Sequence, residues 1–187
     1  MPGDGPDPTD LAGEPPSDEY LLRRLQTMDP ERFEHFVADL WTYLGWDTRV
    51  VGEPGDRGID VIATSERESG ERKTQLIQAK RYGPTTTVGS PEVQQYASLR
   101  LQEESVDLVT IVTTGEYSQQ AEDMAPDLDV ILVDGEELLG ILTETESYEL
   151  FAHYFPEIDL APDAGDGDGD RDDDPDGLLD RVRSLFE

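Results

Sequence analysis

Three polar side chains in two apolar segments have the types and spacing that phosphoryl chemistry requires. Asp60 interrupts the β-branched run Ile59–Ala63, while Gln78 and Lys80 lie two residues apart in the run Thr74–Tyr82. Because side chains alternate along a strand, Gln78 and Lys80 share one face. A carboxylate and an amide oxygen suit Mg²⁺, and an ammonium group can orient or deprotonate a water or stabilise developing charge. An aspartate is unfavourable in such a run, so it indicates either a metal ligand or catalytic acid, or a solvated sheet face.

A helix before these segments offers a fourth candidate. At about 100° per residue, Glu34 lies at the margin of the apolar stripe, beside Trp41, and can reach the edge or end of a sheet. An ordinary glutamate at the helix margin is the alternative interpretation. His35 falls on the opposite face, where we expect solvent. The loop Gly55–Gly58, which contains Arg57, is either a phosphate-binding loop of backbone N–H groups and a guanidinium or a plain turn.

The elements that position these residues are predicted from periodicity, caps and turn residues. The predicted helices are Asp18–Met28, Pro30 to about Leu44, Ser90 to about Glu104, Ser118–Ala125, Gly135 to about Thr143 and Ser147–Phe155. The predicted strands are Thr48–Val51, Ile59–Ala63, Thr74–Tyr82, Asp107–Thr113 and Val130–Val133. This order predicts an α/β fold in which helices flank a mixed central sheet.

Several segments occur in the order found in one known family. They are Phe33-Glu34, Gly45-Trp46, Gly55–Val61, Gln78–Tyr82, Val88, the helix from Pro91, Val112–Thr114, Tyr117-Ser118 with Ala121 and Ala125, and Leu132–Gly135 with Leu138. Together they resemble the catalytic domain of Mrr-type restriction endonucleases, in the PD-(D/E)xK nuclease superfamily. The resemblance covers about Pro30 to Leu139.

The resemblance implies a restriction-endonuclease-like core and a magnesium-dependent DNA endonuclease directed against foreign or modified DNA. By position, Asp60 is the metal-binding acid, Lys80 the catalytic lysine and Glu34 the helix acid that completes the site. Gln78 replaces the superfamily's usual glutamate, a variant common in this family, so Glu34, Asp60 and Gln78 are the expected metal ligands. The glutamine removes one negative charge from the metal site, which implies either weaker metal affinity or greater reliance on Glu34.

Two other functions remain open on the sequence. A structure-specific nuclease such as a junction resolvase is one alternative, although resolvases usually keep glutamate at the position of Gln78. A catalytically silent module that binds DNA or a protein is the other. For the endonuclease we expect double-stranded DNA as substrate and a homodimer, because double-strand cleavage needs two active sites. No small-molecule cofactor beyond the metal is expected.

The chain is strongly acidic, with 44 acidic and 14 basic side chains, a net charge of −30 and only two lysines. This composition resembles that of proteins from salt-accumulating halophiles, because molar salt shortens the screening length to about 3 Å and mutes self-repulsion. An acidic protein with acidic tails and a nucleic-acid mimic are the alternatives. DNA binding normally uses basic side chains, so Arg57 and Arg81 are expected to bind DNA. They belong to a predicted positive lane near Lys80 made of Arg49, Arg57, Arg72, Arg81 and Arg100.

The composition also divides the chain and excludes some chemistries. Residues 1–18 are proline-rich and acidic, and we expect them to be disordered. We expect residues 19–160 to form the nuclease domain. The segment 161–176, with eight aspartates, is predicted to be a disordered linker, and 177–187 to form a short amphipathic helix. We expect no separate DNA-binding domain within residues 1–29, which are too few to form one. The chain has no cysteine and only two histidines, which excludes thiolate and multi-histidine metal sites. It shows neither a secretory start nor a long apolar run, so we expect a cytoplasmic protein without membrane partners.

Overall fold

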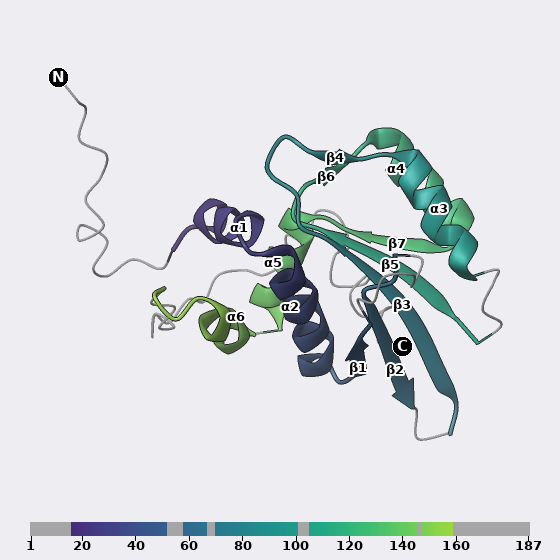
Figure 1. Ribbon diagram of the computed structural model, residues 1–187, viewed down its shortest axis with the longest axis horizontal. Coiled ribbons are helices and arrows are strands. Elements are labelled where there is room, and N and C mark those ends of the chain that lie inside the picture. Colours follow the sequence, from purple (N-terminus) through teal and green to yellow (C-terminus); the bar gives the residue numbers. More distant parts are fainter. Residues whose placement is uncertain (1–15, 52–57, 67–69, 101–104, 146, 159–187) are drawn as a thin grey trace, which may run out of the picture.

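A five-stranded mixed sheet forms the centre of the structure, a computed structural model that describes residues 16–51, 58–66, 70–100, 105–145 and 147–158 (Figure 1). The strands lie in the order β1-β2-β3-β5-β7. Antiparallel pairs join β1 to β2 and β2 to β3, whereas β3, β5 and β7 run parallel. The bounds are β1 Asp47–Val50, β2 Val61–Glu66, β3 Arg72–Lys80, β5 Leu108–Thr113 and β7 Val130–Val133.

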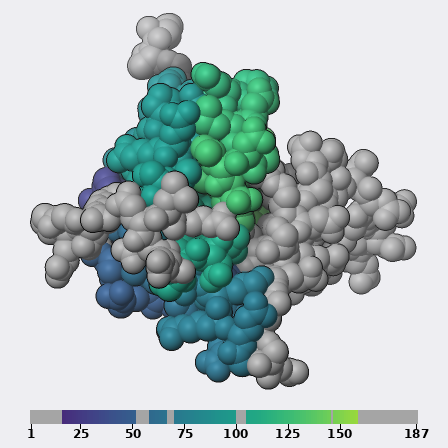
Figure 2. Space-filling model, turned by 90° about the vertical axis from the view of Figure 1, so that its right-hand side faces the viewer, coloured from purple at the N-terminus to yellow at the C-terminus, as the bar shows by residue number. Residues whose placement is uncertain are grey.

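Helices cover both faces of this sheet. One face carries α1 (Asp18–Gln26), α2 (Pro30–Tyr43), α5 (Gly135–Glu144) and α6 (Tyr148–Tyr154), and the other carries α3 (Ser90–Arg100) and α4 (Gln119–Met124). Figure 2 shows α3 and α4 side by side on the second face. Because strand side chains alternate, Ile77 and Ala79 enter the core under α2, while Leu76 enters the core under α3.

Local chemistry explains where α2, which carries Glu34, and α5 begin. The Asp29 side chain accepts hydrogen bonds from the N–H groups of Glu31 and Arg32, and Pro30 occupies the first turn of α2. Asp134 and Glu137 form a reciprocal capping box at the start of α5. Gly45, with φ 96°, follows the end of α2 and turns the chain towards β1.

The predicted α/β fold with a mixed sheet and flanking helices is confirmed. All five predicted strands and the six helices predicted between Asp18 and Phe155 are present, most of them with shifted ends. Strand β2 begins after Asp60 and continues to Glu66, so Asp60 precedes the strand. Ile59 packs with Ile62 against the α3 core, although strict alternation along a strand would put Ile59 on the face of Val61 and Ala63. The reason is that residues 58–60 are not yet in regular strand conformation.

Three short elements were not predicted. Strand β4 (Thr87–Val88) pairs in parallel with β6 (Glu116–Tyr117), and a 3₁₀ turn, η1, spans Pro126–Leu128. Two-residue strands carry no periodicity, so the pairing arises only when the fold brings these segments together.

Several sequence predictions concern residues outside the described part of the chain. These are residues 101–104 at the expected end of α3, the linker 161–176, the helix 177–187, and all but the last three residues of the segment 1–18. Within the described ranges, no helix is both long and apolar enough to cross a membrane.

Candidate active site

The backbone on both sides of Asp60 fixes its place at the end of the sheet. Val51 N donates to Asp60 O at 2.8 Å, and Asp60 N donates to Ile77 O at 3.1 Å. The residue is therefore held between the first and third strands, although β2 formally begins at Val61. Its side chain is buried, as is that of Gln78 on β3.

The Asp60 carboxylate is hydrogen-bonded on one oxygen. Asp60 Oδ2 accepts from Ala79 N at 2.7 Å and from Gln78 Nε2. Gln78 Oε1 is buried and has no hydrogen-bond partner among the described residues. A buried acceptor without a partner is unfavourable, so this oxygen is suited to an added ligand.

Gly58 closes the site from the loop side. It adopts φ 82°, a left-handed conformation that favours glycine. A Cβ atom at Gly58 would lie 3.2 Å from Gln78 Oε1 and 3.1 Å from Tyr96 Cε1. Glycine is therefore required here both for the backbone conformation and for space beside the unpartnered oxygen.

The surroundings of Asp60 disfavour its charged form. Burial raises the pKa of Asp60 from 3.8 to about 7; the Ala79 hydrogen bond opposes the rise, the negative charge of Glu34 adds to it, and Lys80 lowers it. Burial and the neighbouring Glu31 also raise the pKa of Glu34. A divalent cation between these carboxylates would compensate both charges.

Lys80 ends β3 with its ammonium group surrounded on several sides. Lys80 Nζ lies 3.6 Å from Glu92 Oε1, and 5.6 and 5.3 Å from the ring centroids of Tyr82 and Tyr96. Burial lowers the pKa of Lys80, but the phenolic groups of Tyr96 and Tyr82 outweigh it, so the net shift is upward. Lys80 is therefore an ammonium ion at neutral pH.

The structure thus brings Asp60, Gln78 and Lys80 together and places Glu34 within electrostatic reach of Asp60. No group of three histidine, cysteine, aspartate or glutamate side chains in the described ranges could hold a metal ion, so a three-protein-ligand site needs the amide oxygen of Gln78. His35 is exposed, as expected.

The arginines predicted to bind DNA or to form the positive lane do not all lie near Lys80. Arg57 lies outside the described residues. Arg81 is partly buried and donates from Nη1 to Gln26 O at 3.3 Å, which ties the end of β3 to α1. Arg72 opens β3 and Lys80 ends it, so at about 3.3 Å per residue the strand separates them by roughly 26 Å. Arg72 is therefore not part of a lane beside Lys80.

Sequence reasoning missed three neighbours of Lys80: Tyr82, which follows β3, and Glu92 and Tyr96. Glu92 and Tyr96 are four residues apart on α3 and so share one helix face. That spacing, next to a segment with Gln78 and Lys80, is the signal that could have identified them.

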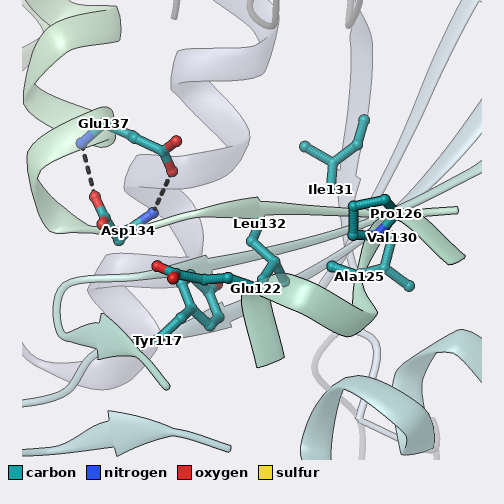
Figure 3. A pocket seen from close by; sticks show the side chains of 9 residues that line it. All are labelled: Tyr117, Glu122, Ala125, Pro126, Val130, Ile131, Leu132, Asp134 and Glu137. Carbon is teal, nitrogen blue, oxygen red and sulfur yellow. Dashed lines mark hydrogen bonds between the residues drawn. The ribbon is translucent and has the colours of Figure 1, made fainter. Parts of the chain in front are cut away.

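Two hollows lie elsewhere, near the ends of β5 and β7. One has a volume of about 330 Å³ and the other of about 340 Å³; both are lined by Tyr117, Glu122 and Asp134, and neither includes a residue of the candidate site. Figure 3 shows the first hollow, with the Asp134–Glu137 capping box at its rim.

The class of fold follows from comparison with solved structures. The chain is similar to AspBHI, a DNA modification-dependent restriction endonuclease, with a TM-score of 0.61 and 21% identity over 79% of this chain and 41% of that chain. It is also similar to the MspJI restriction endonuclease in complex with a 27-mer oligonucleotide, with a TM-score of 0.52 and 22% identity over 80% of this chain and 38% of that chain. The mixed sheet with helices on both faces is therefore the restriction endonuclease fold.

Sequence comparison assigns the chain to a family within this fold. The chain belongs to the restriction endonuclease family defined by the Mrr catalytic domain, whose profile matches residues 25–142. It is 32% identical over 163 residues to the type IV methyl-directed restriction enzyme EcoKMrr of Escherichia coli K12, an alignment that covers 76% of this chain and 52% of the relative. The chain thus spans about half the length of that relative. The resemblance inferred from the motifs is confirmed.

Proposed function

We propose that this protein is a magnesium-dependent DNA endonuclease of the restriction type, which hydrolyses phosphodiester bonds of foreign or modified DNA. The observation that carries the proposal is the buried, unpartnered Gln78 Oε1 beside the Asp60 carboxylate, two residues before the ammonium group of Lys80. Family membership supports the chemistry. The names of two relatives, one methyl-directed and one modification-dependent, favour modified DNA as the substrate.

The donor set fits Mg²⁺. Asp60 and Glu34 offer carboxylate oxygens and Gln78 an amide oxygen, which are the ligands that this ion prefers, and Mg²⁺ commonly retains several waters in addition. When bound, the ion activates a water and neutralises charge on the phosphoryl group. Because Gln78 is neutral, Glu34 supplies the second negative charge, and its electrostatic contact with Asp60 supports that role.

The chain's own residues supply position and charge. Asp60 must lose its proton to act as a ligand, and its raised pKa makes this step sensitive to pH near neutrality. Lys80 stays protonated, so it orients the water and stabilises negative charge that develops on the phosphate rather than removing a proton. The glycine at position 58 leaves room beside Gln78 Oε1 for a ligand.

The substrate and assembly complete the proposal. We expect double-stranded DNA, contacted by Arg57 and by the part of the Arg81 guanidinium not used by Gln26, and a homodimer that supplies one site per strand. We also propose that residues 19–160 are the nuclease module and that the acidic segment 1–18, the linker 161–176 and the amphipathic segment 177–187 flank it. The acidic surface suits function in the cytoplasm of a salt-accumulating cell, where screening lets DNA approach.

Plasmid cleavage in molar potassium chloride tests the proposal. Methylated and unmethylated DNA are incubated with the wild type, Asp60→Ala and Lys80→Ala, with Mg²⁺ or with chelator. Lys73→Ala is the matched control, because it replaces the chain's other lysine at the opposite end of β3. Mg²⁺-dependent cleavage that only the Asp60 and Lys80 variants lose supports the proposal. If folded wild type cuts neither DNA, the proposal is wrong, and a structure-specific nuclease or a silent binding module replaces it.

A further inference from the structure

Three side chains outside the four predicted site residues converge on the ammonium group of Lys80. Tyr82 follows β3, and Glu92 and Tyr96 lie on α3. The two aromatic rings stand 5.6 and 5.3 Å from Lys80 Nζ, and the Glu92 carboxylate stands 3.6 Å from it. We call Tyr82, Glu92 and Tyr96 together the lysine clamp.

The Glu92 carboxylate is itself held in place. Glu92 Oε2 accepts from Gly89 N at 3.2 Å, and Glu92 Oε1 accepts from the Tyr82 hydroxyl at 3.4 Å. Glu92 also lies in the first turn of α3, where the helix dipole favours a negative charge. One oxygen is therefore anchored to the backbone, and the other faces both Lys80 and Tyr82.

The clamp also contacts the metal-binding side of the site. Tyr96 is buried, and its hydroxyl would lie 3.3 Å from a Cβ atom at Gly58, the glycine next to Gln78 Oε1. One face of α3 thus reaches both the lysine and the space beside the unpartnered oxygen. A substitution on this face of α3 should therefore affect both Lys80 and the space beside Gln78 Oε1.

We infer that Glu92 is a positioning residue, which together with Tyr82 and Tyr96 holds the Lys80 ammonium group in the orientation that cleavage requires. The inference rests on the proposed function, in which Lys80 acts at the scissile phosphate. A lysine is a point charge on a flexible stem, so its place must be imposed by its neighbours. Because the Glu92 side chain is about a third exposed, its ion pair with Lys80 contributes little to folding stability. Positioning of Lys80 therefore explains better why three side chains converge on its ammonium group.

Kinetics of Glu92→Gln provide the first test. Glutamine keeps the shape and can still accept from Gly89 N, but it lacks the charge that holds Lys80. We expect kcat for plasmid cleavage to fall by about 10- to 100-fold, as for a reacting group misplaced by about 1 Å, with KM for DNA nearly unchanged. Glu92→Asp, which keeps the charge, should recover part of the loss. Glu122→Gln, an exposed glutamate on α4, is the matched control and should cleave like the wild type.

Nuclear magnetic resonance provides a readout that does not depend on cleavage. The chain has only two lysines, so protein labelled at lysine Cε gives two signals, assigned with Lys73→Arg. Ring currents of Tyr82 and Tyr96 should displace the Lys80 signal from that of Lys73. Glu92→Gln should move the Lys80 signal towards the Lys73 position and leave Lys73 unchanged, whereas Glu122→Gln should move neither.

The outcomes separate the inference from the proposed function. If the wild type cleaves DNA and Glu92→Gln retains its kcat or its Lys80 signal, the positioning role is wrong and the proposed function stands. If the wild type does not cleave, the proposed function fails and the role in cleavage fails with it; the Lys80 signal then still reports whether Glu92 holds the lysine. Reduced kcat together with a displaced Lys80 signal supports the inference.

Discussion

Replacing Asp60 by asparagine should abolish metal-dependent cleavage and stabilise the metal-free protein. The Asp60 pKa rises from 3.8 to about 7 on folding, so the fold favours the neutral carboxyl and penalises the carboxylate. A rise of about three pH units corresponds to about 4 kcal/mol at about 1.4 kcal/mol per unit. Because local relaxation and the ions of molar salt offset part of this penalty, we expect about half of it, about 2 kcal/mol. Asparagine can accept the same two hydrogen bonds, from Ala79 N and Gln78 Nε2, without the charge.

The sign of the pH dependence follows from the direction of the shift. The folded protein binds more protons than the unfolded chain between pH 3.8 and about 7, so wild-type stability decreases as pH rises through this window. The gain in free energy of unfolding from Asp60→Asn should therefore reach its full value above about pH 7 and about a third of that value near pH 5. Lower pH values approach the isoelectric point of about 4.1 and are avoided.

Urea unfolding followed by circular dichroism, in molar potassium chloride with chelator at about pH 5 and about pH 8, measures the difference. Asp107→Asn is the matched control, because exposed Asp107 also accepts from a strand N–H, that of Thr74 at 2.7 Å. Added Mg²⁺ should stabilise the wild type and not Asp60→Asn. An Asp60→Asn protein no more stable than the wild type at pH 8, or an advantage that does not grow with pH, would refute the reasoning.

Three further predictions concern the site and its supports. Isothermal titration calorimetry should show Mg²⁺ affinity falling about tenfold per pH unit below about pH 7, because protonation of Asp60 competes with the metal; a pH-independent affinity would contradict this. Gly58→Ala should lower the free energy of unfolding by at least about 1–2 kcal/mol and reduce cleavage, because alanine disfavours φ 82° and its Cβ would crowd Gln78 and Tyr96. Gly70→Ala, which has a similar φ of 81° and open space, should show the stability loss without the loss of cleavage. Gln75→Leu should lower the free energy of unfolding in urea by about 1–3 kcal/mol, because Trp41 Nε1, which donates to Gln75 Oε1 at 2.9 Å, loses its buried acceptor. The folded variant should still cleave DNA. An unchanged urea midpoint would exclude this role for Gln75.

Local sequence determined the secondary structure and the chemical type of the site. Alternation along Arg72–Lys80 placed Gln78 and Lys80 on one face, and Asp29-Pro30 set the start of α2, because these are effects of neighbouring residues on the backbone. The metal-binding and catalytic roles of the four candidates remain predictions that the variants above test. The resemblance to the Mrr catalytic domain also came from the order of motifs alone, and the family comparison confirms it.

Long-range packing decided which side chains meet. Only the pairing of β2 with β3 brings Asp60 to Gln78 across 18 positions of sequence, and only the placement of α3 over the sheet brings Glu92 and Tyr96 to Lys80. The parallel pairing of β4 with β6 has the same origin. Periodicity specifies the face on which a residue lies, but strand register and helix placement depend on burying both faces of the sheet at once. For that reason the sequence named the candidate residues, and the tertiary structure supplied the neighbours that set their charge and position.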